Sequence, residues 1–124
     1  MTSIEQRIAA TDLSEFAIFE GDCVNIAVAL TRVFGGEIVA SYAHEVDFLD
    51  GNPAHAAARI HGTLYDGSGT TSEDELRERA YYGVTDQDWD EIIVTGVQEP
   101  DSKLLNPETV EIIETRLRSA SKNA

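Results

Sequence analysis

The sequence predicts an α+β fold, in which a buried central helix packs on a small antiparallel sheet. Residues 22–34 have the apolar spacing of a buried helix, residues 55–60 and 63–66 have the form of a short hairpin, and residues 91–97 are typical of a strand. The chain has 124 residues, and one domain usually contains about 100–200 residues. We therefore expect a single domain over residues 1–124.

The first expected element is a short helix over residues 3–10. Ser3 and Gln6 have the spacing of a capping box, in which each side chain accepts a hydrogen bond from the backbone N–H of the other residue. Ile4 and Ile8 fall on one helix face, which we expect to pack on the core.

The central helix is expected over residues 22–34, with Asp22 as its N-cap and Gly35-Gly36 as its C-terminal stop. Apolar residues occupy nearly every side of this segment, which is typical of a helix that is buried on most of its faces. Cys23 lies in its first turn.

The sheet is expected to contain a strand over residues 37–42, followed by a hairpin of residues 55–60 and 63–66. His61 and Gly62 are placed as the two turn residues, because glycine after a polar residue between two short runs favours a tight hairpin.

Two further helices are expected, one over residues 72–80 and one that begins at Asn106-Pro107. In the last helix three apolar residues share the inward face: Val110, Ile113 and Leu117. Four other segments are expected to be loops or turns: residues 12–20, 44–52, 67–71 and 99–105. Three aromatic residues are expected in the core or at its edge, with a role in lining a cleft as the alternative: Tyr81, Tyr82 and Trp89.

The charge is strongly negative, with 23 acidic residues against 9 basic ones and a net charge of -14. This balance excludes electrostatic binding to nucleic-acid backbones as the main activity and disfavours docking on anionic membranes. Only Lys103 and Lys122 are lysines. A surface rich in carboxylates and poor in lysine is typical of a protein that stays soluble in a salt-rich cytoplasm, as in a halophile. The alternative is an acidic mimic of nucleic acid that occupies a basic partner.

Cys23 is the only cysteine, so an intrachain disulfide is not possible. Cysteine and histidine do not show the spacing of a structural zinc site, and we expect neither a metal nor another cofactor. The sequence contains no apolar run of the length found in a signal peptide or a membrane span. We therefore expect a cytoplasmic protein.

The hairpin predicts which polar side chains face one another. With His61-Gly62 in the turn, Asp66 lies opposite Ala57, and Ala57 shares a strand face with His55. Asp66 and His55 are then diagonal neighbours on one face, within reach of a side-chain hydrogen bond.

Nucleophilic thiol chemistry needs a thiol, a base beside it and a group that orients the base. A helix N-terminus such as that of Cys23 favours the thiolate, although Asp22 beside it opposes this effect. His55 with Asp66 supplies the base and its orienting group. His61 falls in the turn and His44 has no partner that the sequence identifies, so both are poorer candidates.

Three stretches, GDCVNIAVAL, HAAARIHG and TLYDGSG, resemble the papain-like cysteine hydrolase superfamily, especially its compact NlpC/P60-like branches. In that superfamily an Asp-Cys pair opens the central helix, a histidine begins a strand and a polar third residue lies on the next strand. The resemblance covers about residues 21–68. It implies a papain-like fold with Cys23 as the nucleophile, His55 as the base and Asp66 as the orienting residue.

The sequence therefore predicts a cysteine hydrolase or acyltransferase that acts on an amide or peptide-like bond. A second oxyanion donor is not identified, because the segment before Cys23 lacks the glutamine that papain carries there. A non-catalytic interaction module remains the alternative, either an inactive papain-like fold or the nucleic-acid mimic. A thiol sealed beneath the core favours the inactive fold, and carboxylates concentrated on one elongated face favour the mimic.

Overall fold

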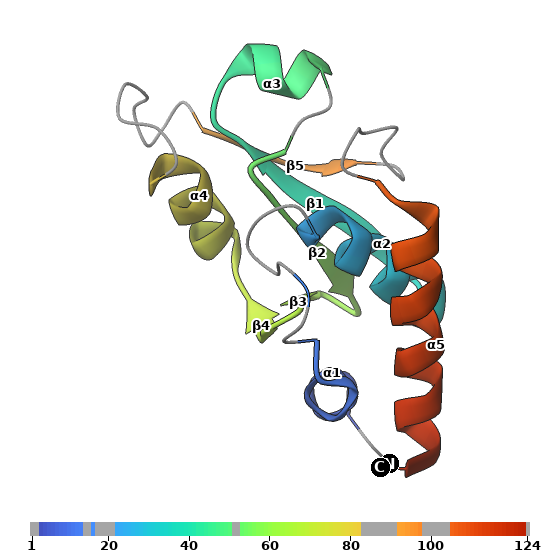
Figure 1. The fold of residues 1–124 in the computed structure, drawn as a ribbon. Coiled ribbons are helices and arrows are strands. Elements are labelled where there is room, and N and C mark those ends of the chain that lie inside the picture. Colours follow the sequence, from blue (N-terminus) through green and yellow to red (C-terminus); the bar gives the residue numbers. More distant parts are fainter. Residues whose placement is uncertain are drawn as a thin grey trace.

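The computed structural model confirms the α+β class: five helices and one five-stranded antiparallel sheet form the described part of the chain (Figure 1). The structure describes residues 3–13, 16, 22–50, 53–82, 92–97 and 105–123. The helices are α1 (Ile4–Thr11), α2 (Cys23–Phe34), α3 (Glu45–Asp50), α4 (Glu73–Tyr82) and α5 (Pro107–Asn123). The strands are β1 (Glu37–Tyr42), β2 (His55–Ile60), β3 (Thr63–Asp66), β4 (Gly69–Thr71) and β5 (Ile93–Val97).

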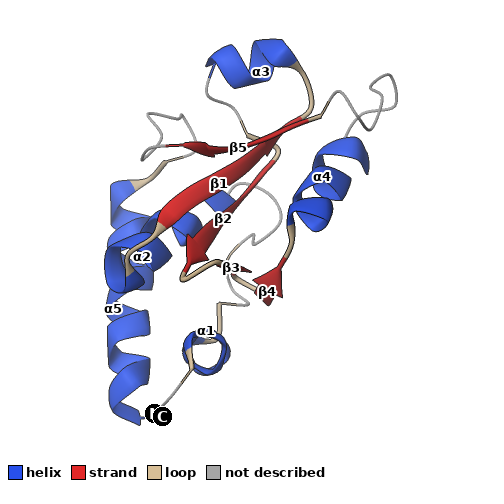
Figure 2. Ribbon diagram, turned by 180° about the vertical axis from the view of Figure 1, so that it is seen from behind, coloured by secondary structure: helices blue, strands red, loops and turns tan. Residues whose placement is uncertain are grey.

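The sheet has the strand order β4-β3-β2-β1-β5, and helices cover both of its faces. Helices α1, α2 and α5 lie on one side and α4 lies on the other (Figures 1 and 2). Because side chains alternate along a strand, β2 contributes to both cores. Ala56, Ala58 and Ile60 pack in the core that contains α2, whereas Ala57 packs with Leu76 of α4.

The helix ends confirm most of the expected caps. In α1 the Ser3 hydroxyl accepts from the N–H of Gln6 and the Gln6 side chain accepts from the N–H of Ser3. At the start of α5, the Asn106 side chain accepts from two backbone N–H groups of the first turn. The three inward residues predicted for this helix are buried: Val110, Ile113 and Leu117.

Asp22 is the residue before α2, as expected, but its role as a side-chain cap is wrong. Its backbone is in the helical region (φ −93°, ψ −1°), whereas a capping residue is usually extended. The carboxylate makes no capping bond to the helix and instead accepts a hydrogen bond from Asn25 Nδ2 at 3.2 Å.

Two segments expected to be irregular contain secondary structure. Part of the loop predicted over residues 44–52 is helix α3, in which the backbone N–H groups of Asp47 and Phe48 both bond to the carbonyl of His44. The turn predicted over residues 67–71 occupies only residues 67–68, because Asp66 already pairs with Gly69 and the chain returns along β3 as strand β4. Both elements are too short to produce a clear periodic pattern.

Tyr81 is 37% exposed, so it does not lie in the core. The side chains of Tyr82 and Trp89 lie outside the described residues, as does most of the loops predicted over residues 12–20 and 99–105. None of the helices within the described residues has the length and apolar character needed to cross a membrane.

Candidate active site

The β2–β3 hairpin has the register that the sequence predicts. Ile60 pairs with Thr63 and Ala58 with Tyr65, so the turn is His61-Gly62. Both turn residues have positive φ, at 51° and 83°, as the common two-residue hairpin turn of type I′ requires. Continued by one residue, this register puts Asp66 opposite Ala57 and on the same face as His55.

His55 and Asp66 form a buried pair at this point. His55 Nε2 lies 3.0 Å from Asp66 Oδ2, and the two residues are 1% and 3% exposed. A carboxylate only accepts hydrogen bonds, so Nε2 carries the proton in this contact. In a neutral imidazole Nδ1 is then the basic nitrogen, and this atom is buried as well.

Ser68 holds the other oxygen of Asp66. Its backbone N–H and its hydroxyl donate to Oδ1, at 2.8 and 2.5 Å. Ser68 is a residue that the sequence pattern did not single out, although in Asp-Gly-Ser after a strand the aspartate often accepts a hydrogen bond from the N–H two residues later. Both carboxylate oxygens of Asp66 therefore have hydrogen-bond partners, which fixes the orientation of the carboxylate and of the imidazole bonded to it.

These bonds determine the ionisation of Asp66. Burial by itself would raise the pKa of the carboxyl, but the hydrogen bonds from His55 and Ser68 more than offset it and lower the pKa below its ordinary value of 3.8. Asp66 is therefore ionised at neutral pH and is the acceptor in both contacts.

Cys23 is the first residue of α2 and is almost completely buried, with 2% of its surface exposed. Burial raises the pKa of its thiol from 9.0 to about 11, and the negative charge of Asp22 adds to this rise. Backbone N–H groups of Ala56, Val24 and Cys23 oppose the rise because each favours the thiolate. Burial dominates, so the thiol is protonated at neutral pH in this structure.

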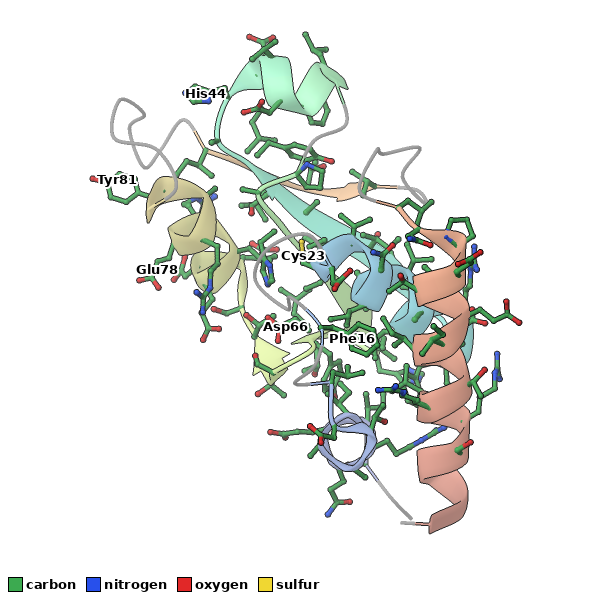
Figure 3. All side chains as sticks on the ribbon, viewed as in Figure 1. Phe16, Cys23, His44, Asp66, Glu78 and Tyr81 are labelled. Atoms are coloured by element: carbon green, nitrogen blue, oxygen red, sulfur yellow. The ribbon has the colours of Figure 1, made fainter. Side chains whose placement is uncertain are left out.

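The contact with Ala56 brings Cys23 to the strand that carries His55. Ala56 follows His55 directly in β2, so the sulfur lies beside the backbone at the beginning of that strand. Figure 3 shows Cys23 at the start of α2 and Asp66 on the neighbouring hairpin. Cys23 thus lies beside the backbone of the strand that carries His55, whereas the side chains of His55 and Asp66 share the strand face of Ala57, which packs on α4.

The other two histidines lie apart from this group. His61 is exposed in the hairpin turn. His44 has a partner that the sequence did not identify, since its Nδ1 lies 3.3 Å from Asp47 Oδ2 in a partly exposed pair. Among the described residues, no cluster of three or more histidine, cysteine, aspartate or glutamate side chains is suited to hold a metal ion.

No protein-family model, curated protein or solved structure matches this chain.

Proposed function

We propose that the protein is a papain-like cysteine hydrolase or acyl-transfer enzyme that acts on an amide or peptide-like bond. Cys23 is the nucleophile, His55 is the general base and Asp66 orients the imidazole. The observation that carries the proposal is the buried hydrogen bond of 3.0 Å between His55 and Asp66. Ala56, the residue after His55 in β2, contacts the sulfur of Cys23 through its backbone.

This arrangement is costly as a purely structural feature. Removing an aspartate and a histidine from water costs free energy, and apolar side chains of similar size would often stabilise a fold equally well. Titratable groups that are buried together are more frequent at functional sites than elsewhere. Ser68 adds two hydrogen bonds that fix the carboxylate, as expected for a site that must hold one histidine orientation.

In the proposed reaction the Cys23 thiol transfers its proton to Nδ1 of His55 while the sulfur attacks the carbonyl carbon. His55 then returns the proton to the leaving amine, which leaves an acyl group on sulfur. Water or another nucleophile releases that group and regenerates the thiol. Asp66 keeps the proton of Nε2 in place throughout, so that Nδ1 stays available for this exchange.

A thiol with a pKa of about 11 is a weak nucleophile at neutral pH unless a base removes its proton. Its 2% exposure also means that substrate reaches the sulfur only after the site opens. The proposal therefore predicts a reactivity that depends on both His55 and local opening.

Alkylation of the thiol tests the proposal directly, because Cys23 is the only cysteine in the chain. The rate with iodoacetamide at pH 7 and working salt should fall by at least about tenfold in His55→Asn and less in Asp66→Asn. His55→Asn is the matched variant, because His55→Ala leaves space through which the reagent can enter. In His55→Asn the rate should rise with pH toward the thiol pKa of about 11, because no neighbouring base then removes the thiol proton.

All variants should label equally in urea, which controls for intrinsic thiol reactivity. Equal labelling of the wild type and His55→Asn under native conditions would exclude the proposal.

The second candidate is a non-catalytic member of the same kind of fold. The burial of Cys23 and its raised pKa favour it, because both are typical of a small core residue. It predicts that Cys23 is alkylated slowly under native conditions, at a rate that His55→Asn does not change. The nucleic-acid mimic has less support, because exposed carboxylates occur on α4 and on α5, on opposite sides of the sheet.

A further inference from the structure

Helix α3 carries a cluster of exposed apolar side chains. The described residues include five large apolar side chains that are exposed: Val46, Phe48, Leu49, Tyr81 and Ile112. Three of them lie within the six residues of α3. Val46 is 59% exposed and Leu49 is 73% exposed, and residues three apart share one helix face. An apolar cluster this exposed is typical of a surface that another molecule covers.

This cluster lies at the end of the sheet where β2, the strand of His55, begins. Helix α3 connects the end of β1 to the start of β2, where His55 lies. The Phe48 ring packs edge-on against Tyr42, with ring centres 5.3 Å apart. Tyr42 in turn belongs to the same buried core as Cys23. The exposed side chains of α3 therefore lie at the end of the sheet where His55 begins its strand, and Figure 3 places His44 there too.

The charge of α3 restricts what can cover it. Its sequence, EVDFLD, contains three acidic residues and no basic one. A second copy of the chain would bring the same acidic helix against itself, with a net charge of -14 on each copy. An anionic membrane is disfavoured for the same reason. Opposite charge is favourable only for a basic partner.

We infer that α3 binds a basic, apolar segment of the substrate that Cys23 attacks. This inference depends on the proposed function, because the bound segment is part of a substrate only if Cys23 is catalytic. Val46 and Leu49 contact the apolar side chains of the segment, and the carboxylates of α3 attract its basic residues. The substrate class is therefore an amide or peptide in which apolar residues are flanked by lysine or arginine.

Peptide binding to the full-length Cys23→Ala variant tests the inference without any turnover. The probe is a fluorescein-labelled peptide with two leucines between lysines, blocked at both ends and measured by anisotropy at constant ionic strength. Replacing both Val46 and Leu49 by serine should weaken binding by at least about tenfold. Ile112→Ser is the matched control, because Ile112 is an exposed apolar residue on α5, and it should change the affinity by less than about twofold. Leu49→Ser alone should have an intermediate effect and guards against misfolding of the double variant.

Two further peptides test the chemistry of the occupant. Exchanging the leucines for serine, or the lysines for glutamate, should each weaken binding to the parent protein by at least about tenfold. Equal affinity for the parent and the double variant, or no binding of the lysine-leucine peptide, would overturn the inference. A dimer in sedimentation that the double variant loses would identify a second copy as the occupant and would also overturn it.

The two proposals fail separately. If His55→Asn labels like the wild type but the peptide still requires Val46 and Leu49, the docking surface stands and the catalytic proposal fails. If labelling requires His55 but peptide binding does not require α3, the catalytic proposal stands alone.

Discussion

Asp66 is held by two neighbours that act on different oxygens, and this division determines what each neighbour contributes. His55 bonds to Oδ2, whereas Ser68 bonds twice to Oδ1. Removal of the Ser68 hydroxyl leaves the His55 contact and the backbone N–H of residue 68 in place. The resulting change therefore isolates how strongly the hydroxyl stabilises the carboxylate.

We expect Ser68→Ala to lower the free energy of unfolding by about 1–2 kcal/mol at pH 7, because one hydrogen bond to a charged group is lost. The pKa of Asp66 lies below 3.8, so its stabilising contribution is present above that pH and is lost as the pH falls through the folded-state pKa. The difference between wild type and Ser68→Ala should therefore shrink on acidification. Urea unfolding at pH 7 and near pH 3 measures it.

Ser119→Ala, at an exposed position of α5, is the control and should show no pH-dependent difference from wild type. A loss in Ser68→Ala that stays constant with pH would mean that the hydroxyl does not act through the carboxylate.

The sequence predicted the site only where periodicity determines side-chain direction. His55 and Asp66 were placed on one face because strand side chains alternate and the His61-Gly62 turn fixes the register, which the structure confirms. The burial of Cys23 was not predictable, because it depends on how α2 packs against β2. The bonds of Ser68 were missed because a turn residue can adopt many local geometries.

At the scale of elements, the connection from α2 to β1 depends on close approach of two backbones. A Cβ added to Gly36 would overlap the carbonyl oxygen of Arg59 in β2, and Gly36 also has a φ of +92°. Glu37, the next residue, pairs with Arg59. The glycine thus lets β1 enter the sheet directly beside β2.

We expect Gly36→Ala to lower the free energy of unfolding by more than about 3 kcal/mol, because it adds a backbone clash to a strained φ. Gly62→Ala is the matched control: its φ is +83°, but a Cβ there meets no atom within 4 Å. It should cost about 1–2 kcal/mol. Urea unfolding of both variants at working salt measures the difference, and equal losses would show that the approach of β1 to β2 is not tight.

The elements that sequence reasoning predicted correctly are those with repeated signals. Helices α1, α2, α4 and α5 have apolar periodicity or caps, and the hairpin has a turn signal. Helix α3 and strand β4 were missed because six and three residues contain too few repeats to distinguish a period. Both form through tertiary contact, Phe48 on Tyr42 and β4 on β3.

At the scale of the whole molecule, the acidic residues are placed mainly outside the candidate site. The candidate residues belong to the apolar helix α2 and to the β2–β3 hairpin, whereas exposed carboxylates occur on α4 and α5. The exposed carboxylates of these helices and the buried His55–Asp66 pair therefore occupy different parts of the described structure. Arg59 forms ion pairs with Glu37 and Glu73, at 2.9 and 2.6 Å, but its positive charge is already included in the net charge of -14.

A net charge of -14 on a chain of this size repels itself, and the compact state brings these charges closer together than the unfolded state does. The Debye length falls from about 10 Å at 0.1 M salt to about 3 Å at 1 M, so salt should remove most of this repulsion. We expect the free energy of unfolding to rise by about 3 kcal/mol between 0.1 and 2 M potassium chloride, measured by urea unfolding.

Replacing Glu78, Glu108 and Glu111 by glutamine removes three negative charges and changes the net charge from -14 to -11. Because Coulomb energy scales with the square of the charge, this variant should be more stable at low salt and its response to salt smaller by about 40%. An identical salt response in the two proteins would instead assign the stabilisation to a general effect of salt on apolar burial, which does not depend on these carboxylates.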